Sequence, residues 1–449
     1  MHLYEYQKTG VAWLLEHGSG LLADEVGLGK TIMTLKIMGI TKPFPALILC
    51  PAILKWQWYE EIRKFLPNVK AVVIEGSAME RAKLWNTDAD VKIANYELLL
   101  RDINYVANIH WELFVCDEAT RIANPWTKTY KALYNIQSKH RIALTGTPIS
   151  NRPNEIWGIL NWCYPACLGK YRGFLDRYCI YDYFGGISRF KNLEELKQRI
   201  APLMIRRLRE DVLPELPEKI ISNIPIVLSD KERALYTKIR KELLYEIEHS
   251  DISKLENPVT IQNTLTKMLR LRQAANSLEL LGENKESAKL QTLKELLPAL
   301  LNGERKAIIF TFFSSMANIL ERELKEWTPL KITGEVKQRE DIVKKFNEDS
   351  ENRILVMTSA GQYGLNIQAA SVVIHYDQEW SLAKMSQREG RAHRIGQKNT
   401  VLVYNLLAKG TVDEYISRVL RKKQQLSRDI LGDGIGAEEI KEILTYGVN

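Results

Sequence analysis

The sequence of 449 residues lacks the features that mark several classes of protein. No apolar run reaches the ~20 residues that a transmembrane helix needs, so a membrane-spanning protein is not predicted. Residues 1–8 are polar and aromatic and show no signal-peptide pattern. There is neither a repeat of fixed period nor a low-complexity tract, which excludes a repeat architecture. We therefore expect a cytoplasmic protein.

Cysteine is scarce, with five residues in the chain. Cys50 and Cys116 lie in apolar, strand-like runs and are predicted to be core thiols. Cys163, Cys167 and Cys179 have a loose spacing and no fourth ligand close by in the sequence, so a zinc site is not favoured. Reduced thiols agree with the expected location.

The composition is that of a soluble globular protein of two to three domains, with 45% apolar and 26% charged residues. The formal net charge is +8, and the isoelectric point is about 9.0. This excess favours a polyanionic partner, although proteins that bind no polyanion also carry a mild positive charge.

The run DEVGLGKT at residues 24–31 is the most informative feature. It follows two leucines and precedes a helical pattern, and a turn that opens into a helix N-terminus binds phosphate through backbone N–H groups. Lys30 would reach the outer phosphates and the Thr31 hydroxyl would ligate Mg²⁺. Asp24 stands where the Walker A pattern has glycine, so an ordinary glycine-rich turn is the alternative.

Two adjacent acids supply a possible second half of a nucleotide site. Asp117 and Glu118 follow the apolar run 111–116, which is typical of a short buried strand. Asp117 would hold Mg²⁺, directly or through water, and Glu118 would orient or deprotonate the attacking water. The alternative for two such acids alone is a solvated acidic turn.

Short apolar runs alternate with helical stretches in both halves of the chain, which predicts an α/β fold with two doubly wound parallel sheets. The middle, residues 151–302, is mostly helical, with one strand signal at 220–227. The end, residues 413–431, is predicted to be a basic helix. The strand candidates are residues 46–50, 71–74, 91–94, 114–116, 141–144, 306–310, 330–333, 354–357, 371–375 and 401–406.

A second basic element lies in the second lobe, at residues 387–397 (QREGRAHRIGQ). Arg391 and Arg394 are three residues apart, and so share one face if the segment is helical. An arginine inserted from another body neutralises the charge that develops on a transferred phosphoryl group. A surface basic helix without a ligand is the alternative for this pattern taken alone.

These motifs together resemble the Swi/Snf-type ATPases of helicase-like superfamily two, from Leu3 to about Leu431 and in the family's order. The segment 24–31 resembles the family's own variant of the phosphate loop, which accounts for Asp24. Thr120, Phe312 and Gln362 depart from the residues usual in the family, which are His, Gln and Gly. The other matching segments are 3–13, 51–65, 95–97, 144–157, 206–219, 306–316, 334–347, 358–366, 380–382 and 387–397.

The resemblance implies two tandem RecA-like lobes with a helical insertion between them and a C-terminal brace helix. It implies an ATP-binding lobe at residues 1–225, a helical linker at 226–302, and a second lobe with the arginine fingers and the terminal basic helix at 303–449. It also assigns the ATP-binding residues, which are Gln7, Asp24, Gly27, Gly29, Lys30, Thr31, Gly364 and Gln387. The implied catalytic residues are Lys30, Asp117, Glu118, Arg391 and Arg394, with Thr31 and Asp117 as Mg²⁺ ligands.

By the same resemblance, the chain is expected to hydrolyse ATP and to move as a monomer along double-stranded DNA, gripping the phosphate backbone. The expected DNA contacts are Lys55, Gln57, Tyr96, Thr358 and Asn366. A strand-separating DNA or RNA helicase and a decayed, non-enzymatic scaffold are the alternatives. The small size of the chain suggests a bacterial or viral source.

Overall fold

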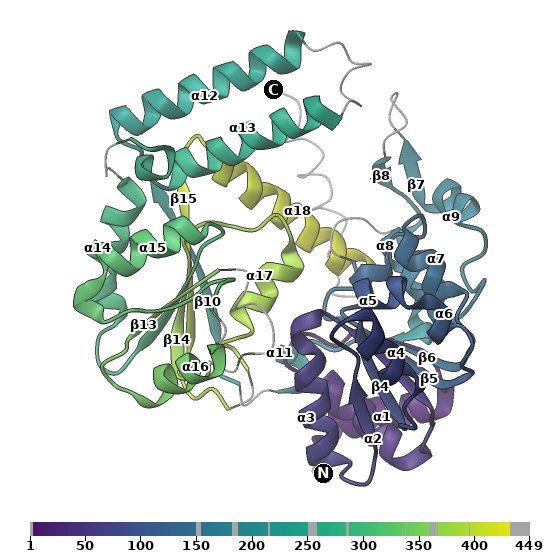
Figure 1. The fold of residues 1–449 in the computed structure, drawn as a ribbon. Coiled ribbons are helices and arrows are strands. Elements are labelled where there is room, and N and C mark those ends of the chain that lie inside the picture. Colours follow the sequence, from purple (N-terminus) through teal and green to yellow (C-terminus); the bar gives the residue numbers. More distant parts are fainter. Residues whose placement is uncertain are drawn as a thin grey trace. The chain divides into compact units, whose positions relative to one another are not determined.

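The computed structural model describes residues 3–149, 154–181, 187–213, 216–249, 258–283, 287–336, 338–358, 365, 367–394 and 396–431. The chain divides into two compact units, residues 1–214 with 422–449, and residues 215–421. Figure 1 draws their elements in sequence colours.

The first unit is built on a parallel sheet with the strand order β3-β4-β2-β5-β6-β1-β9. Its strands are β1 (Gly20–Leu22), β2 (Ala46–Cys50), β3 (Ala71–Val73), β4 (Val91–Asn95), β5 (Trp111–Asp117), β6 (Ser138–Leu144) and β9 (Met204–Ile205). An antiparallel hairpin, β7 (Cys179–Tyr181) with β8 (Ile187–Phe190), lies outside the sheet.

Both faces of this sheet are buried. Successive side chains of a strand point to opposite faces, so one strand contributes to the core on both sides. Leu47 and Leu49 of β2 join one core cluster, whereas Ala46 and Ile48 join the other. A strand covered on both faces is apolar at every position, as in the run from Ala46 to Cys50.

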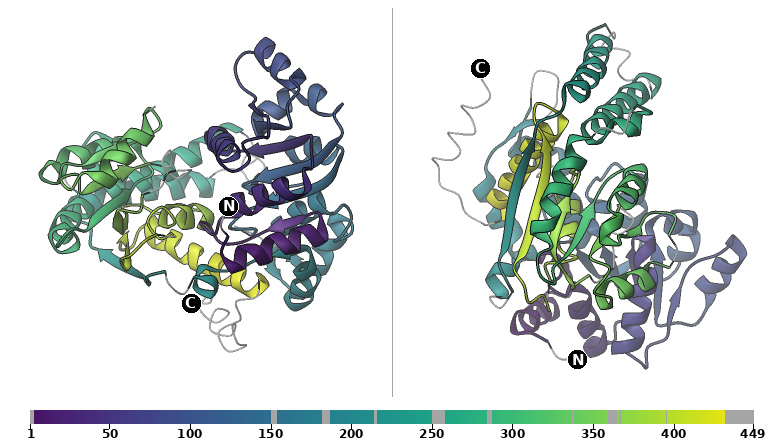
Figure 2. Two further views of the ribbon diagram at one scale, coloured as in Figure 1. Left: turned by 90° about the horizontal axis from the view of Figure 1, so that it is seen from below. Right: turned by 90° about the vertical axis from the view of Figure 1, so that its left-hand side faces the viewer.

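Helices supply the cover on both faces (Figures 1 and 2). One cluster takes residues from α1 (Glu5–His17), α2 (Lys30–Thr41) and α3 (Lys55–Phe65), and the other from α4 (Ala78–Asn86), α5 (Tyr96–Arg101), α7 (Lys128–Tyr134) and α8 (Glu155–Cys163). The remaining helices of this unit are α6 (Ile103–Val106), α9 (Tyr171–Tyr178), α10 (Leu193–Ile200), α11 (Arg209–Val212) and the 3₁₀ turns Ala52–Leu54, Ala119–Ile122 and Ala201–Leu203.

The second unit contains a parallel sheet with the order β10-β15-β14-β11-β13-β12. Its strands are β10 (Lys219–Ile226), β11 (Lys306–Phe310), β12 (Leu330–Ile332), β13 (Ile354–Met357), β14 (Ala370–His375) and β15 (Val401–Ala408). The helices are α12 (Asp230–His249), α13 (Pro258–Asn276), α14 (Ala288–Leu300), α15 (Ser314–Glu323), α16 (Arg339–Glu348) and α17 (Leu382–Glu389), with 3₁₀ turns Leu278–Leu281 and Lys325–Trp327. The last helix, α18 (Val412–Leu431), begins in this unit.

The predicted α/β fold with two parallel sheets is therefore confirmed. The boundary between the lobes differs from the predicted one, since residues up to 225 were assigned to the first lobe. In the structure β10 pairs in register with β15 along its whole length, and the second unit begins at residue 215.

The helical segment at 226–302 also packs within the second unit. Leu290 and Leu293 of α14 are buried in the core of the second sheet, and α12 and α13 run side by side (Figures 1 and 2). Among the described residues, no helix is both long enough and apolar enough to span a bilayer.

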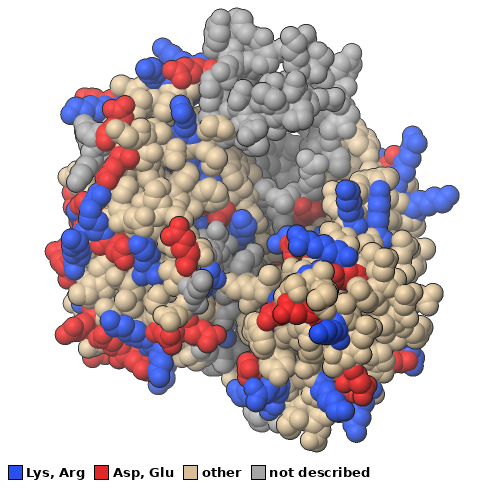
Figure 3. All heavy atoms as spheres, in the orientation of Figure 1, with Lys and Arg blue, Asp and Glu red and all other residues tan. Residues whose placement is uncertain are grey.

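Charged side chains of both signs lie on the face of the molecule that Figure 3 draws. On the face drawn in Figure 3, Lys and Arg side chains are interspersed with Asp and Glu over the described parts of both units. The net charge of +8 is thus not concentrated in one continuous basic surface on this face.

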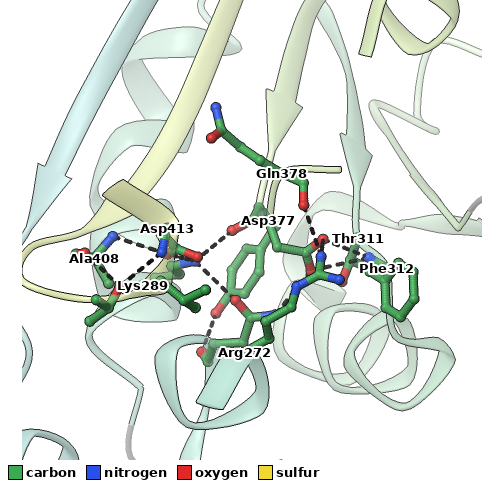
Figure 4. A network of polar contacts seen from close by, with 12 residues as sticks. Arg272, Lys289, Thr311, Phe312, Asp377, Gln378, Ala408 and Asp413 are labelled. Atoms are coloured by element: carbon green, nitrogen blue, oxygen red, sulfur yellow. Dashed lines mark hydrogen bonds and ion pairs between the residues drawn. The ribbon is translucent and has the colours of Figure 1, made fainter. Parts of the chain in front are cut away.

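A buried polar network ties the helices of the second unit to the ends of β11 and β14 (Figure 4). Asp377, two residues beyond the end of β14, accepts hydrogen bonds from Thr311 Oγ1 at 2.7 Å and the Phe312 backbone N–H at 2.8 Å. Its carboxylate also accepts from Asn276 Nδ2 at 2.9 Å and lies 3.7 Å from Arg272 Nη2. These contacts join α13 to the sheet.

Lys289 of α14 extends the same network. Its Nζ lies 2.6 Å from Asp413 Oδ2 and donates to Asn276 Oδ1 at 2.9 Å and to the Tyr376 carbonyl at 3.0 Å. The Lys289 side chain is fully buried and that of Asp413 is 4% exposed. A buried charge of this kind is tolerated only when it is paired and hydrogen-bonded.

We predict that Lys289→Met destabilises the second unit by about 3–5 kcal/mol, because it leaves the Asp413 carboxylate buried without its cation. Lys294→Met is the matched control, since it makes the same change on the same helix at a half-exposed ion pair with Glu323. That loss should be about 0–1 kcal/mol. Urea unfolding followed by circular dichroism measures both, and equal losses would contradict the prediction.

Candidate nucleotide site

The phosphate loop joins β1 to α2 at the carboxyl edge of the first sheet. Leu22, which ends β1, is level with Leu144 of β6, and Leu144 is level with Asp117 of β5. The loop after β1 and the acids at the end of β5 therefore leave the sheet at the same edge, where ligands bind in open parallel sheets.

Glycine is required at the point where the loop turns into the helix. Gly29 precedes α2 with φ 82° and ψ 36°, a left-handed conformation that favours glycine. A Cβ atom at Gly29 would lie 2.5 Å from Gln7 Nε2. The loop thus has the strand, turn and helix that the sequence predicted.

Lys30 begins α2, and its side chain folds back over the loop. Its Nζ donates to the carbonyls of Asp24 at 2.7 Å and Glu25 at 3.2 Å. Burial lowers the pKa of Lys30, whereas the nearby carboxylates of Asp24, Glu118 and Asp117 raise it. Lys30 and both predicted catalytic acids are therefore close enough to interact electrostatically.

Asp117 is held by three neighbours that fix its orientation. Its Oδ2 accepts from Trp58 Nε1 at 2.9 Å, and its Oδ1 accepts from the Glu118 backbone N–H at 2.9 Å. The Tyr96 hydroxyl donates to the Asp117 carbonyl at 2.7 Å. Burial raises the pKa of Asp117, and the Trp58 hydrogen bond and the Lys30 charge act in the opposite direction.

Glu118 has a strained backbone, with φ 52° and ψ 54°. A left-handed conformation costs a non-glycine residue roughly 1–3 kcal/mol, and such residues cluster at functional sites. The strain here turns the chain sharply after β5. Glu118 remains half-exposed, so its side chain is accessible to a ligand.

These residues can accommodate Mg²⁺ in the way that nucleotide sites usually do. Mg²⁺ takes few protein ligands and completes its shell with water and phosphate oxygens, and Thr31 and Asp117 are both half-exposed. The part of the chain that the structure describes contains no group of three or more His, Cys, Asp or Glu residues that could hold a metal. Cys167, one of the three cysteines weighed as zinc ligands in the sequence analysis, is a free thiol whose pKa is raised by burial to about 11.

Two residues predicted to touch ATP have other partners in the structure. Gln7 Nε2 donates to the Leu28 carbonyl at 3.2 Å and to the Tyr6 hydroxyl at 3.3 Å, so it supports the loop. Asp24 is fully buried and forms an ion pair with Arg207, whose Nε donates to Oδ1 at 2.9 Å. The Asp24 carboxylate therefore faces an arginine within the fold.

Most of the predicted DNA contacts are buried. Lys55 donates to the Ile74 carbonyl at 2.9 Å, and Tyr96 and Thr358 are each 3% exposed. Gln57 of α3 is exposed, and it is the one described residue of this set whose side chain is accessible to a ligand. Asn366 lies outside the described residues.

In the second unit, helix α17 ends at Glu389, before the predicted arginine fingers. The segment after Gly390 forms turns, in which the His393 N–H bonds to the Glu389 carbonyl at 2.9 Å. Arg391 and Arg394 thus do not share a helix face, contrary to the condition stated from the sequence. Gly364, a predicted ATP contact, lies outside the described residues.

Residues 388–394, the arginine segment, are held within the second unit by hydrogen bonds to main-chain carbonyls and by ion pairs. Arg391 donates through Nη1 to the Leu365 carbonyl at 3.0 Å and through Nε to the Gln387 carbonyl at 3.2 Å. Arg388 is fully buried and pairs with Glu379 at 2.9 Å. Glu389 pairs with Lys219 at 2.8 Å, and this keeps the pKa of Glu389 low, at about 2, against the opposing effect of burial.

Three residues of the site were not identified from the sequence. Trp58, Arg207 and Arg209 appeared only within the segments 51–65 and 206–219 that resemble the family, with no role of their own. Trp58 bonds to a residue 59 positions away, and Arg207 to one 183 positions away. Spacing along the chain carries no signal for contacts of this kind.

Two α/β units with parallel sheets, the first carrying a phosphate loop beside paired acids, define a helicase-like ATPase with tandem RecA-like lobes. The family described as "SNF2-related domain" matches residues 6–280, and the helicase conserved C-terminal domain matches residues 288–396. The chain belongs to the SNF2-related family, as the resemblance predicted, and is of the ATP-using class.

Several known proteins are similar to this chain. An uncharacterized ATP-dependent helicase of Mycoplasma genitalium is 33% identical over 97% of this chain and 43% of its own length. The putative ATP-dependent helicase/translocase YwqA of Bacillus subtilis is 31% identical over 99% and 51%. The ISWI chromatin-remodeling complex ATPase ISW1 of Saccharomyces cerevisiae is 31% identical over 96% and 40%.

The chain thus spans about half or less of the length of these curated relatives. Among solved structures, the Sulfolobus solfataricus SWI2/SNF2 ATPase core in complex with double-stranded DNA is 31% identical, with 98% of this chain and 96% of that chain covered and a TM-score of 0.47.

We predict that Trp58→Phe lowers the rate of Mg²⁺-dependent ATP hydrolysis about 10–100-fold, because Trp58 orients Asp117, the predicted Mg²⁺ ligand, and losing the group that orients a metal ligand has effects of this size. The Trp58 N–H stabilises the ionised form of Asp117, so its loss raises the pKa of Asp117 further. The deficit should grow as the pH falls, and the acid limb of the rate profile should move to higher pH.

Trp162→Phe is the matched control, because Trp162 is fully buried in the same unit and its indole N–H has no partner among the described residues. The measurement is the pH dependence of the ATPase rate for both variants. Superimposable profiles would show that the Trp58 hydrogen bond does not tune Asp117.

Proposed function

We propose that this chain hydrolyses ATP and uses the energy to move along double-stranded DNA. The observation that carries the proposal is the grouping of Lys30, Asp117 and Glu118 at the carboxyl edge of one parallel sheet. A cation, a metal-binding carboxylate and a second carboxylate at the start of a helix match the parts that phosphoryl transfer needs.

Each residue has a distinct proposed role. Lys30 exchanges its contacts with the loop carbonyls for the outer phosphates of ATP, and the loop N–H groups hold the remaining phosphate oxygens. Thr31 and Asp117 would hold Mg²⁺, which neutralises phosphate charge when bound. Glu118 orients the attacking water or accepts its proton.

Arg391 and Arg394 are the proposed arginine fingers, with Gln387 and Gly364 as further ATP contacts of the second unit. An arginine supplied to the γ-phosphate can raise the rate by about 10³–10⁵-fold. Because these residues belong to a different unit from Lys30, we propose that turnover requires the two units to close on one ATP.

Double-stranded DNA is the proposed track. The positive net charge suits a polyanion, and grip on the phosphate backbone is independent of sequence. Of the predicted contacts, Gln57 is the exposed candidate on the first unit. We propose a monomeric motor located in the cytoplasm.

Strand separation is the second candidate, since two similar proteins carry the name ATP-dependent helicase. A decayed scaffold is disfavoured, because Lys30, Thr31, Asp117 and Glu118 are all present and half-exposed. A duplex carrying a fluorescent strand separates the first two readings, since only a helicase releases that strand during turnover.

The nature of the track is tested by the ATPase rate with duplex DNA, single-stranded DNA and RNA. We predict the largest stimulation by duplex DNA, and binding that weakens steeply with salt, because each neutralised phosphate releases counterions. Stronger stimulation by RNA, or affinity that does not change between low and high salt, would contradict a grip on duplex phosphates.

The role of Glu118 is tested by Glu118→Gln. We predict that this variant still binds ATP and DNA, whereas turnover falls about 10²–10⁴-fold, the usual contribution of a general base. Glu112→Gln is the control, since Glu112 lies on β5, the strand that Glu118 follows, and pairs with Lys139 at 3.1 Å. Normal turnover by the Glu118 variant would remove the residue from this role.

A further inference from the structure

The segment that follows β9 runs alongside the phosphate loop. Strand β9 lies at the sheet edge beside β1, and its pairing continues past the ends of both strands. The Ala23 N–H bonds to the Ile205 carbonyl at 2.8 Å, and the Glu25 N–H bonds to the Arg207 carbonyl at 3.0 Å. The first part of the loop is thus held as an added length of sheet.

Arg207 grips this loop through the residue that replaces the usual glycine. Its guanidinium bonds to both oxygens of Asp24, at 2.9 Å to Oδ1 and 2.5 Å to Oδ2, in the two-pronged geometry that strengthens arginine–carboxylate pairs. It also donates to the Tyr6 carbonyl. A Cβ atom at Gly10 would lie 2.7 Å from Arg207 Nη2, so glycine makes room for this contact.

Arg209 grips the next two residues of the loop. Its backbone N–H bonds to Glu25 Oε2 at 3.0 Å, and its Nε donates to the Val26 carbonyl at 2.7 Å. The Arg209 side chain is 4% exposed. Its charge is close enough to Lys30 to lower the pKa of that ammonium.

Asp24, Glu25 and Val26, which are consecutive, are therefore each bound to a segment that lies about 180 residues further along the chain. These are the residues from which the loop enters its two glycines. The same segment continues through α11 to residue 215, where the second unit begins. A change in the loop and a change in the path of this connecting segment are thus coupled by direct contacts.

We propose that Arg207 and Arg209 are positioning residues that hold the phosphate loop in its nucleotide-binding shape and couple that shape to the segment leaving the first unit. The inference rests on the proposed function, because it assigns a ligand to the loop. It gives Asp24 a role within the fold, in place of the predicted contact with ATP.

The first test is the affinity for a fluorescent ATP analogue with Mg²⁺, measured for wild type and Arg207→Gln. We expect about 10–100-fold weaker binding by the variant, the range found when an orienting partner of a ligand-binding group is removed. Arg209→Gln leaves the Asp24 carboxylate paired and is the second variant, so the inference stays testable if Arg207→Gln does not fold.

Arg81→Gln is the matched control for lost stability. Arg81 and Asp102 form a second buried pair in the same unit, with Nε 2.7 Å from Oδ2 and Nη2 2.9 Å from Oδ1. This variant should lower the melting temperature and leave the affinity for the ATP analogue unchanged. An equal loss of affinity in the Arg81 and Arg207 variants would overturn the inference, because the effect would then be general destabilisation.

A double-mutant cycle separates positioning by the pair from two independent effects. If Arg207 acts through Asp24, the variant carrying both Arg207→Gln and Asp24→Asn should bind the analogue no more weakly than Arg207→Gln alone. Additive losses would overturn this route. Wild-type protein that binds no nucleotide would overturn the proposed function as well, whereas equal binding by wild type and both arginine variants would overturn only the inference.

Discussion

The parallel register of three adjacent strands, β5, β6 and β1, is the constraint on which the site depends. It aligns Leu22, Leu144 and Asp117 in one row, so the loop that follows β1 and the acids that end β5 meet at one edge. Lys30 and Asp117 are far apart in the sequence, and the strand register alone brings them to the same edge of the sheet. The sheet does this because all its strands run in the same direction.

Lys30 and Asp117 are only partly exposed to water, so their charges need partners within the protein. Lys30 is bonded to two loop carbonyls, and Asp117 accepts two N–H groups, so each charge has partners within the first unit. Such compensation is necessary, because an isolated charge away from water is strongly destabilising. The same bonds fix the directions in which the side chains point, and a site with preset directions loses little freedom when a ligand binds.

The second unit shows the same principle in a different place. Asp377 and Asp413 are each nearly fully buried, and each is matched by a basic side chain from the helical segment, Arg272 or Lys289. These ion pairs therefore hold the helices α13 and α14 in the second unit. Arg388, near the end of α17, pairs with Glu379. The position of the arginines that follow this helix therefore depends on buried charges as well as on apolar packing.

The sequence predicted what is encoded locally. The run 46–50 reads as a strand because every position is apolar, and it is one. The turn at Gly29 reads as a phosphate loop because glycine and the following helix are adjacent in the chain. The pairing of β10 could not be predicted. The strand at 219–226 pairs with the strand at 401–408, and neither run contains a pattern that indicates its partner.

Side-chain direction was the other missing information. Lys55 reads as a cation available to a ligand, yet its Nζ turns inward to the carbonyl of Ile74, and Tyr96 turns towards Asp117. The same holds for Asp24, whose partner Arg207 becomes its neighbour only when β9 is added to the sheet edge. A motif identifies residue types, whereas tertiary contacts determine which of them remain free to bind.

A crystal structure of the chain with Mg²⁺ and a non-hydrolysable ATP analogue tests the central claim most directly. We expect the outer phosphates in contact with Lys30 Nζ and the loop N–H groups, and Mg²⁺ bound to Thr31 and Asp117. A nucleotide bound elsewhere, with Lys30 still bonded to the carbonyls of Asp24 and Glu25, would contradict it.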